Sequence, residues 1–145
     1  MSSTWQQQLR DNAKRLALQG GELLEMCTDK ELQRICNGIG PQWFPEHLRN
    51  LIDRFNPTLR QVADLHDLMY YFADGSDEAF HRANAAFASN GITMAKDRYA
   101  WYDPRRYWVI LKAKEFADIC DILGKPAYMA AIRQSNNDIA SKQTS

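Results

Sequence analysis

Apolar residues in this chain recur every three or four positions between its prolines and glycines, and no run of them alternates with polar residues. The first spacing puts side chains on one face of a helix, whereas a half-buried strand needs the second. The clearest case follows Asn56-Pro57, a typical helix start with Asn as the cap and Pro in the first turn. One broad face of this predicted helix, residues 57–73, carries Leu59, Val62, Ala63, His66, Met69, Tyr70 and Ala73. The sequence therefore predicts an all-α fold.

A second helix follows this one after a tight turn. Asp74-Gly75-Ser76 is a turn sequence, and the acidic Asp77 and Glu78 suit the positive first turn of a helix. Asn90-Gly91 is a typical helix end. We therefore predict two antiparallel helices, about 57–73 and 77–90, at the centre of a single helical domain.

Flanking helices are predicted before this pair. An amphipathic helix begins at Trp5 and fades near Cys27. Residues 28–31 form a capping box that starts a short helix, which must stop within Asn37-Gly38-Ile39-Gly40-Pro41. Pro45 suits the first turn of another helix.

Flanking helices are also predicted after the pair. Residues 92–102 are expected to be irregular, and Asp103-Pro104 caps a long helix that ends at Gly124. Pro126 opens a last helix through Ile132. Residues 136–145 are predicted to be a polar C-terminal tail that frays.

Length and charge exclude several classes of protein. The 145 residues suffice for one domain with a real core, which we assign to residues 1–135. Lys plus Arg and Asp plus Glu number 18 each, so no overall field favours nucleic acid, and no nucleic-acid partner is expected. Residues 1–15 lack the apolar segment of a secretory signal peptide, and no stretch is long enough to span a bilayer. Three cysteines are too few for a disulfide scaffold, so we expect a cytoplasmic protein with reduced thiols in the cell that makes it.

The segment 63–71 carries adjacent His66 and Asp67, with Tyr70 four residues after the histidine. Neighbouring helical side chains point about 100° apart, so His66 and Asp67 cannot pair well with each other, but they can face one cavity. His66 and Tyr70 share a face of the helix. One interpretation is a hydrogen-bonded histidine near a solvated aspartate, and the other is a functional site.

The segment Gly38-Ile39-Gly40 suggests which reaction a functional site at His66 and Asp67 would perform. Glycines let a loop curl so that its carbonyl oxygens converge, and calcium binds such oxygens together with a carboxylate such as Asp67. The ion can polarise an ester carbonyl, while a neutral His66 could take a proton from an attacking water. The pattern indicates metal-assisted ester hydrolysis.

Cys36-Asn37-Gly38-Ile39-Gly40-Pro41, followed by His66-Asp67-Leu68-Met69-Tyr70, resembles the phospholipase A2 superfamily, in particular its short, disulfide-poor bacterial and viral branches. The resemblance covers about residues 36–90. It implies a calcium-dependent hydrolase that acts on glycerophospholipids at a membrane or phospholipid surface. Gly38, Gly40 and Asp67 would hold Ca²⁺, and His66 would be the general base. A loop-built calcium site needs more calcium than the cytosol holds, so the implied enzyme acts after release or delivery.

The family also has an aspartate on the following helix that orients the histidine, often with an aromatic residue three positions later. Asp77 with Phe80 is one such frame, and Asn84 with Phe87 is another. If the helices turn back near residue 75, the position opposite His66 is near residue 84, which favours Asn84. An Asn carbonyl can fix the tautomer of a histidine, but it cannot stabilise an imidazolium by charge.

A second hypothesis is a non-catalytic helical module that binds a protein partner or assembles with itself. It is favoured by Asn84 in the place of a charge, by the lack of a secretion signal, and by an aromatic stretch at 99–108 that is expected to be exposed and is interleaved with basic residues. The aromatic and basic residues in and beside this stretch are Arg98, Tyr99, Trp101, Tyr102, Arg105, Arg106, Tyr107 and Trp108. The alternatives for them are a core edge with cation–π contacts or stacking on a base or sugar.

Other polar and aromatic residues have simpler interpretations. His47 and His81 lie among charged residues and are expected on solvated faces. Trp43-Phe44 is expected to pack in the core, with a lipid interface as the alternative. Residues 43–55 also make the interval between the glycine segment and His66 longer than in the family.

Overall fold

The computed structural model describes residues 4–38 and 57–144, and within these ranges it contains helices and no strand. The helices are α1 (Trp5–Leu16), the 3-10 helix η1 (Gly21–Met26), α2 (Asp29–Gly38), α4 (Pro57–Tyr71), α5 (Asp77–Arg98), α6 (Pro104–Leu123) and α7 (Lys125–Thr144). The predicted all-α fold is confirmed. No helix in the described ranges is both long enough and apolar enough to cross a membrane.

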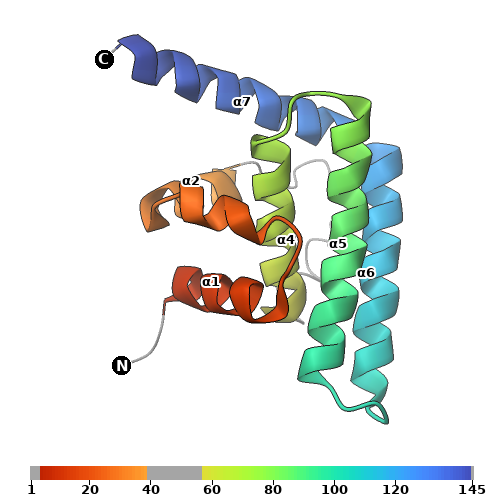
Figure 1. Ribbon diagram of the computed structural model, residues 1–145. Coiled ribbons are helices and arrows are strands. Elements are labelled where there is room, and N and C mark those ends of the chain that lie inside the picture. The colour runs from red at the N-terminus through yellow and green to blue at the C-terminus, as the bar shows by residue number, and fades with distance from the viewer. Residues whose placement is uncertain (1–3, 39–56, 145) are drawn as a thin grey trace.

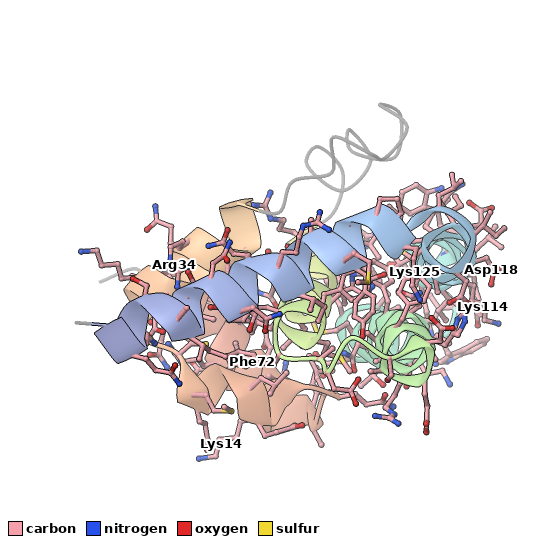
Figure 2. All side chains as sticks on the ribbon, turned by 90° about the horizontal axis from the view of Figure 1, so that it is seen from above. Lys14, Arg34, Phe72, Lys114, Asp118 and Lys125 are labelled. Carbon is pink, nitrogen blue, oxygen red and sulfur yellow. The ribbon has the colours of Figure 1, made fainter. Side chains whose placement is uncertain are left out.

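Three helices form the frame of the molecule (Figure 1). α4, α5 and α6 run antiparallel in succession, and α5 packs against both of the others. α1 and α2 lie on the side of α4 away from α6. α7 crosses over the end of the frame and extends past α2, as the view from above shows (Figure 2).

Two buried clusters meet at α4. The larger core lies between α4 and its neighbours, and its fully buried large side chains include Leu9, Leu24, Leu32, Leu59, Val62, Leu65, Leu68, Phe87, Val109 and Cys120. The smaller cluster lies beneath the start of α7 and contains Tyr70, Phe80, Ala83, Tyr128 and Ala131. The His66 ring contacts a member of each cluster, Tyr70 at 4.2 Å and Phe87 at 5.4 Å between ring centroids, so it lies where the two clusters join.

Helix starts lie where local capping predicts them. Thr28 Oγ1 accepts from the Glu31 amide at 3.1 Å, and Glu31 Oε1 accepts from the Thr28 amide at 3.1 Å, which completes the capping box of α2. Asp103 Oδ1 accepts from the Arg105 amide at 2.9 Å at the start of α6. Both caps use partners within three residues, which makes them visible in the sequence.

The first helix is shorter than predicted. It ends at Leu16 because Ala17 adopts a left-handed conformation with a φ of 52°, and the chain then forms η1 rather than continuing the α-helix. Gly20 is also left-handed, with a φ of 85°. A side chain there would begin 2.9 Å from Cγ of Met69, so this glycine permits the close approach of the turn to α4.

α5 is longer than predicted, and residues 92–98 are helical rather than irregular. Asn90 does not end the helix, because its side chain is buried and bonds both the amide of Gln19, at 2.8 Å, and the carbonyl of Gln19, at 2.9 Å. Gly91 does not end it either. A Cβ at Gly91 would lie 2.4 Å from Cβ of Ala113, so the glycine lets α5 and α6 approach closely.

α7 also continues beyond the predicted end at Ile132, through the residues expected to fray. Asp138 in this part accepts a hydrogen bond from Arg34 Nη1 at 2.6 Å and another from the Tyr71 hydroxyl. These bonds tie the end of α7 to α2 and α4. The helix predicted from Pro45, together with Trp43, Phe44 and His47, lies outside the described residues.

Candidate active site

The turn between α4 and α5 sets which residues face each other. Gly75 has a φ of 89°, and Asp74 Oδ1 accepts from the Ser76 amide at 2.9 Å, which closes the turn. Ser76 then caps α5 by accepting from the Ala79 amide at 3.1 Å. This hairpin brings Asn84 opposite His66, as the register argument predicts.

His66 and Asn84 are in direct contact. His66 Nε2 lies 2.8 Å from Asn84 Oδ1, and the Tyr70 hydroxyl donates to the same oxygen at 2.6 Å. The alternative frame is wrong, since Asp77 lies at the exposed start of α5 and pairs with Lys125. The structure thus brings together three of the predicted site residues, His66, Tyr70 and Asn84.

The orientation of Asn84 determines the tautomer of His66. Asn84 is fully buried, and its Nδ2 donates to Asp121 Oδ1 at 2.8 Å, so its Oδ1 must be the atom that faces His66. An oxygen there accepts, which requires a hydrogen on His66 Nε2. The other ring nitrogen, Nδ1, then carries the lone pair.

His66 is held neutral by its surroundings. Burial lowers the pKa of His66 to about 4, and the opposing effects of the Asn84 hydrogen bond and the Asp121 charge do not offset it. The imidazole is therefore uncharged at pH 7. A neutral ring whose Nδ1 carries the lone pair can accept a proton at that atom.

Asp67 lies in a second polar environment on the same helix. Burial, followed by the charge of Asp64 one turn earlier, raises the pKa of Asp67 well above its ordinary value. Asp64 is itself buried, and burial raises its pKa to about 6 although Arg60 Nε lies 3.5 Å from its Oδ1. The charge of Asp67 also adds to burial in raising the pKa of Cys36 on α2 and of Cys120 on α6.

The end of α2 approaches this carboxylate pair. The Cys36 thiol donates to the carbonyl oxygen of Asp64 at 3.6 Å. Gly38 is the last residue of α2, so it belongs to the helix rather than to the predicted loop. Gly40 lies outside the described residues.

Of the residues predicted to hold calcium, the structure describes Gly38 and Asp67. Within residues 4–38 and 57–144, no three side chains of His, Cys, Asp or Glu are grouped to hold a metal. Calcium binds backbone carbonyl oxygens. The last carbonyl groups of a helix such as α2 have no hydrogen-bond partner within the helix. Asp67 lies one position after His66 on α4, and its raised pKa favours the protonated carboxyl.

The sequence did not predict that two further residues belong to the His66 network. Asp121 on α6 and His81 on α5 extend the chain of contacts from Asn84 to the surface, and His81 Nδ1 lies 2.9 Å from Asp121 Oδ1. His81 is exposed, as expected for a solvated face. Asp121 is 37 positions from Asn84, and no local pattern marks it.

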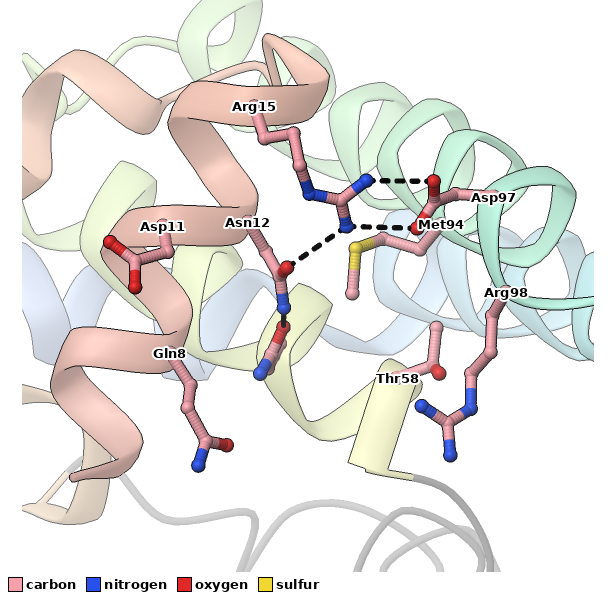
Figure 3. Close-up of a pocket in the computed structure, with 9 residues that line it drawn as sticks. Gln8, Asp11, Asn12, Arg15, Thr58, Met94, Asp97 and Arg98 are labelled. Atoms are coloured by element: carbon pink, nitrogen blue, oxygen red, sulfur yellow. Dashed lines mark hydrogen bonds and ion pairs between the residues drawn. The ribbon is translucent and has the colours of Figure 1, made fainter. Parts of the chain in front are cut away.

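The cavity in Figure 3 is separate from this network. It has a volume of about 440 Å³ and lies among α1, the start of α4 and the end of α5. Some of its polar side chains bond one another: Arg15 bonds both carboxylate oxygens of Asp97, at 2.8 and 2.9 Å, and Asn12 donates to Gln61 at 2.8 Å. None of the residues that line it belongs to the His66 network.

Known proteins do not identify this arrangement. No family model, no curated protein and no solved structure matches the chain.

Proposed function

We propose that this chain is a calcium-dependent, phospholipase A2-like hydrolase that acts on the ester bonds of glycerophospholipids. The observation that carries the proposal is the contact of His66 Nε2 and the Tyr70 hydroxyl with one oxygen of Asn84, at 2.8 and 2.6 Å. A histidine held in one tautomer by a buried acceptor, with the lone pair on its second nitrogen, is the arrangement that a general base requires.

Each residue has a distinct role in the proposed reaction. His66 Nδ1 takes a proton from the water that attacks the ester, while Asn84 and Tyr70 hold the ring. Asp67 and carbonyl oxygens at the end of α2 and in the Gly38–Gly40 segment would hold calcium, which supplies polarisation of the ester carbonyl.

The neutral partner of His66 makes this a weak base. An aspartate in place of Asn84 would stabilise the imidazolium that forms when His66 accepts a proton, and an amide does so less. A base with a pKa of about 4 also has less driving force for proton transfer than one near 7. We expect slow turnover, with the acid limb of the rate profile near pH 4 instead of near pH 6.

Lipid release from phospholipid vesicles by the purified chain tests the proposal. We expect release in millimolar calcium and none above background in EDTA. His66→Ala should lower the rate by about 10²–10⁴, the usual contribution of a general base. Asp118→Ala is the control, because it changes an exposed residue of α6 outside the His66 network, and it should leave the rate unchanged. Equal rates with calcium, with EDTA and in the His66 variant would refute the proposal.

The second candidate is the non-catalytic module that binds a protein partner or assembles with itself. It is supported by Trp101 and Tyr102, whose side chains are 72% and 73% exposed at the turn between α5 and α6. Arg105 lies 5.0 Å from the Tyr99 ring in the same region, in the predicted cation–π contact. A chain that releases no lipid, yet sediments as a dimer that Trp101→Ala dissociates, would favour the module over the enzyme.

A further inference from the structure

We propose that Asp121 is a positioning residue for His66, because it fixes the side-chain amide of Asn84 and thereby selects which ring nitrogen of His66 carries hydrogen. The inference rests on the proposed function for its catalytic consequence. The structural part stands on the contacts of His66, Tyr70, Asn84 and Asp121 alone.

The contacts leave Asn84 one orientation. In the observed one, Oδ1 accepts from His66 and Tyr70, and Nδ2 donates to the Asp121 carboxylate at 2.8 Å. Rotation of the amide by 180° would place Oδ1 against that carboxylate, and two acceptors at this distance repel each other. Asp121 therefore excludes the rotated amide.

Without Asp121, no facing acceptor excludes the rotated orientation of Asn84, although the Tyr70 hydroxyl still donates to Oδ1 in the observed one. The rotated amide would donate from Nδ2 to the lone pair of His66 Nε2, which requires the tautomer with hydrogen on Nδ1. That tautomer has no free Nδ1 to accept a proton from water. Loss of Asp121 should thus impair the base without any direct contact between Asp121 and His66.

Asp121 also supplies the charge that Asn84 lacks. Its carboxylate stands one hydrogen bond beyond Asn84. Asp121 is partly open to solvent and is bonded by His81 at 2.9 Å, so its geometry is held from both sides. The order along the network is His66, Asn84, Asp121 and His81, from the core to the surface.

Long-range ¹H–¹⁵N correlation spectra of the histidine-labelled chain test the proposal without lipid or calcium. We expect wild-type His66 to show hydrogen on Nε2 only. Asp121→Ala should give a mixture of tautomers or mainly the Nδ1–H form. Asp121→Asn should also give a mixture, because an amide at position 121 can present either an acceptor oxygen or a donor nitrogen to Asn84.

The matched control is Asp118→Ala, since Asp118 lies one turn earlier on the exposed side of α6 (Figure 2). It should leave the His66 spectrum unchanged. A single Nε2–H tautomer in Asp121→Ala would overturn the proposal.

Catalysis adds a separate measurement. If the chain hydrolyses lipid, Asp121→Ala should lower kcat about 10- to 100-fold with KM changed less than about twofold, because substrate does not touch Asp121. A chain with no lipase activity that still shows the tautomer change would refute the proposed function and keep this inference. If the chain hydrolyses lipid and its Asp121→Ala variant keeps both the Nε2–H tautomer and the wild-type kcat, the proposed function stands and this inference is refuted.

Discussion

Asp64 and His66 are both buried and lie two positions apart on α4. Burial shifts their pKa values in opposite directions. Burial raises the pKa of Asp64 to about 6 and lowers the pKa of His66 to about 4. Both shifts disfavour the charged form, which for Asp64 is the form above pH 6 and for His66 the form below pH 4. α4 therefore keeps both side chains largely neutral between about pH 4 and pH 6.

The shift of Asp64 predicts a pH-dependent effect of its substitution. Between its ordinary pKa of 3.8 and its folded pKa of about 6, the folded state binds more protons than the unfolded state, so the contribution of Asp64 to stability falls as pH rises. Asp64→Asn removes this loss. We expect the variant to gain about 1–3 kcal/mol of unfolding free energy relative to wild type between pH 4 and pH 8, measured by urea denaturation. Asp118→Asn, at an exposed position, should show no such trend, and a pH-independent difference for Asp64→Asn would contradict the prediction.

At the scale of the helices, close approach between α5 and α6 depends on Gly91. Replacing glycine by alanine within a helix stabilises by up to about 1 kcal/mol through propensity alone. At this position the new Cβ would lie 2.4 Å from Cβ of Ala113, and such overpacking costs about 1–3 kcal/mol. Gly91→Ala should therefore destabilise the chain in thermal or urea denaturation.

The double variant Gly91→Ala with Ala113→Gly is the control for that substitution. It moves the glycine to the facing helix and restores the room, so its stability should return to within about 1 kcal/mol of wild type. A single variant as stable as wild type would show that the helices separate at no cost.

The helices also show which features a sequence can predict. The caps of α2 and α6 were predictable because Thr28 bonds Glu31 and Asp103 bonds Arg105, within the reach of a local pattern. The pairing of His66 with Asn84 was predictable because one tight turn fixes the register of both helices. Asn90 misled the prediction, since the partner that keeps it inside a helix is Gln19, 71 positions away.

The candidate site divides in the same way. Its members on α4 and α5 follow from the His-Asp pattern and the hairpin. Asp121 comes from α6, and only the packing of α5 against α6 brings it to Asn84. Gly38 was placed in a loop because glycine favours helix ends, yet it is the last helical residue of α2.

Calcium binding should be visible in the stability of the whole molecule. A ligand that binds only the folded chain stabilises it by about 2.7 kcal/mol at a hundred times its dissociation constant. For a chain of this size we expect a rise of several degrees in Tm in differential scanning calorimetry. Magnesium should do much less, because it prefers a rigid octahedral shell and keeps its waters.

Asp67→Asn separates this effect from nonspecific screening. The variant should lose the calcium-dependent rise while its Tm in EDTA changes little or increases, since a buried carboxylate with a raised pKa is replaced by a neutral group of similar shape. Asp118→Asn should keep the rise. If calcium does not change the wild-type Tm, the proposed calcium site is wrong. The proposed effect of Asp121 on the tautomer of His66 does not depend on this result.

The bond between Arg34 and Asp138 joins positions 104 residues apart, and the Tyr71 hydroxyl shares the same carboxylate. Contacts of such long sequence separation form late, because a large loop must close before they contribute. During synthesis, the bond between Arg34 of α2 and Asp138 of α7 cannot form until residue 138 has left the ribosome. The contact that ties α2 and α4 to the last turns of α7 can therefore form only after α1, α2, α4, α5 and α6 have all been synthesised.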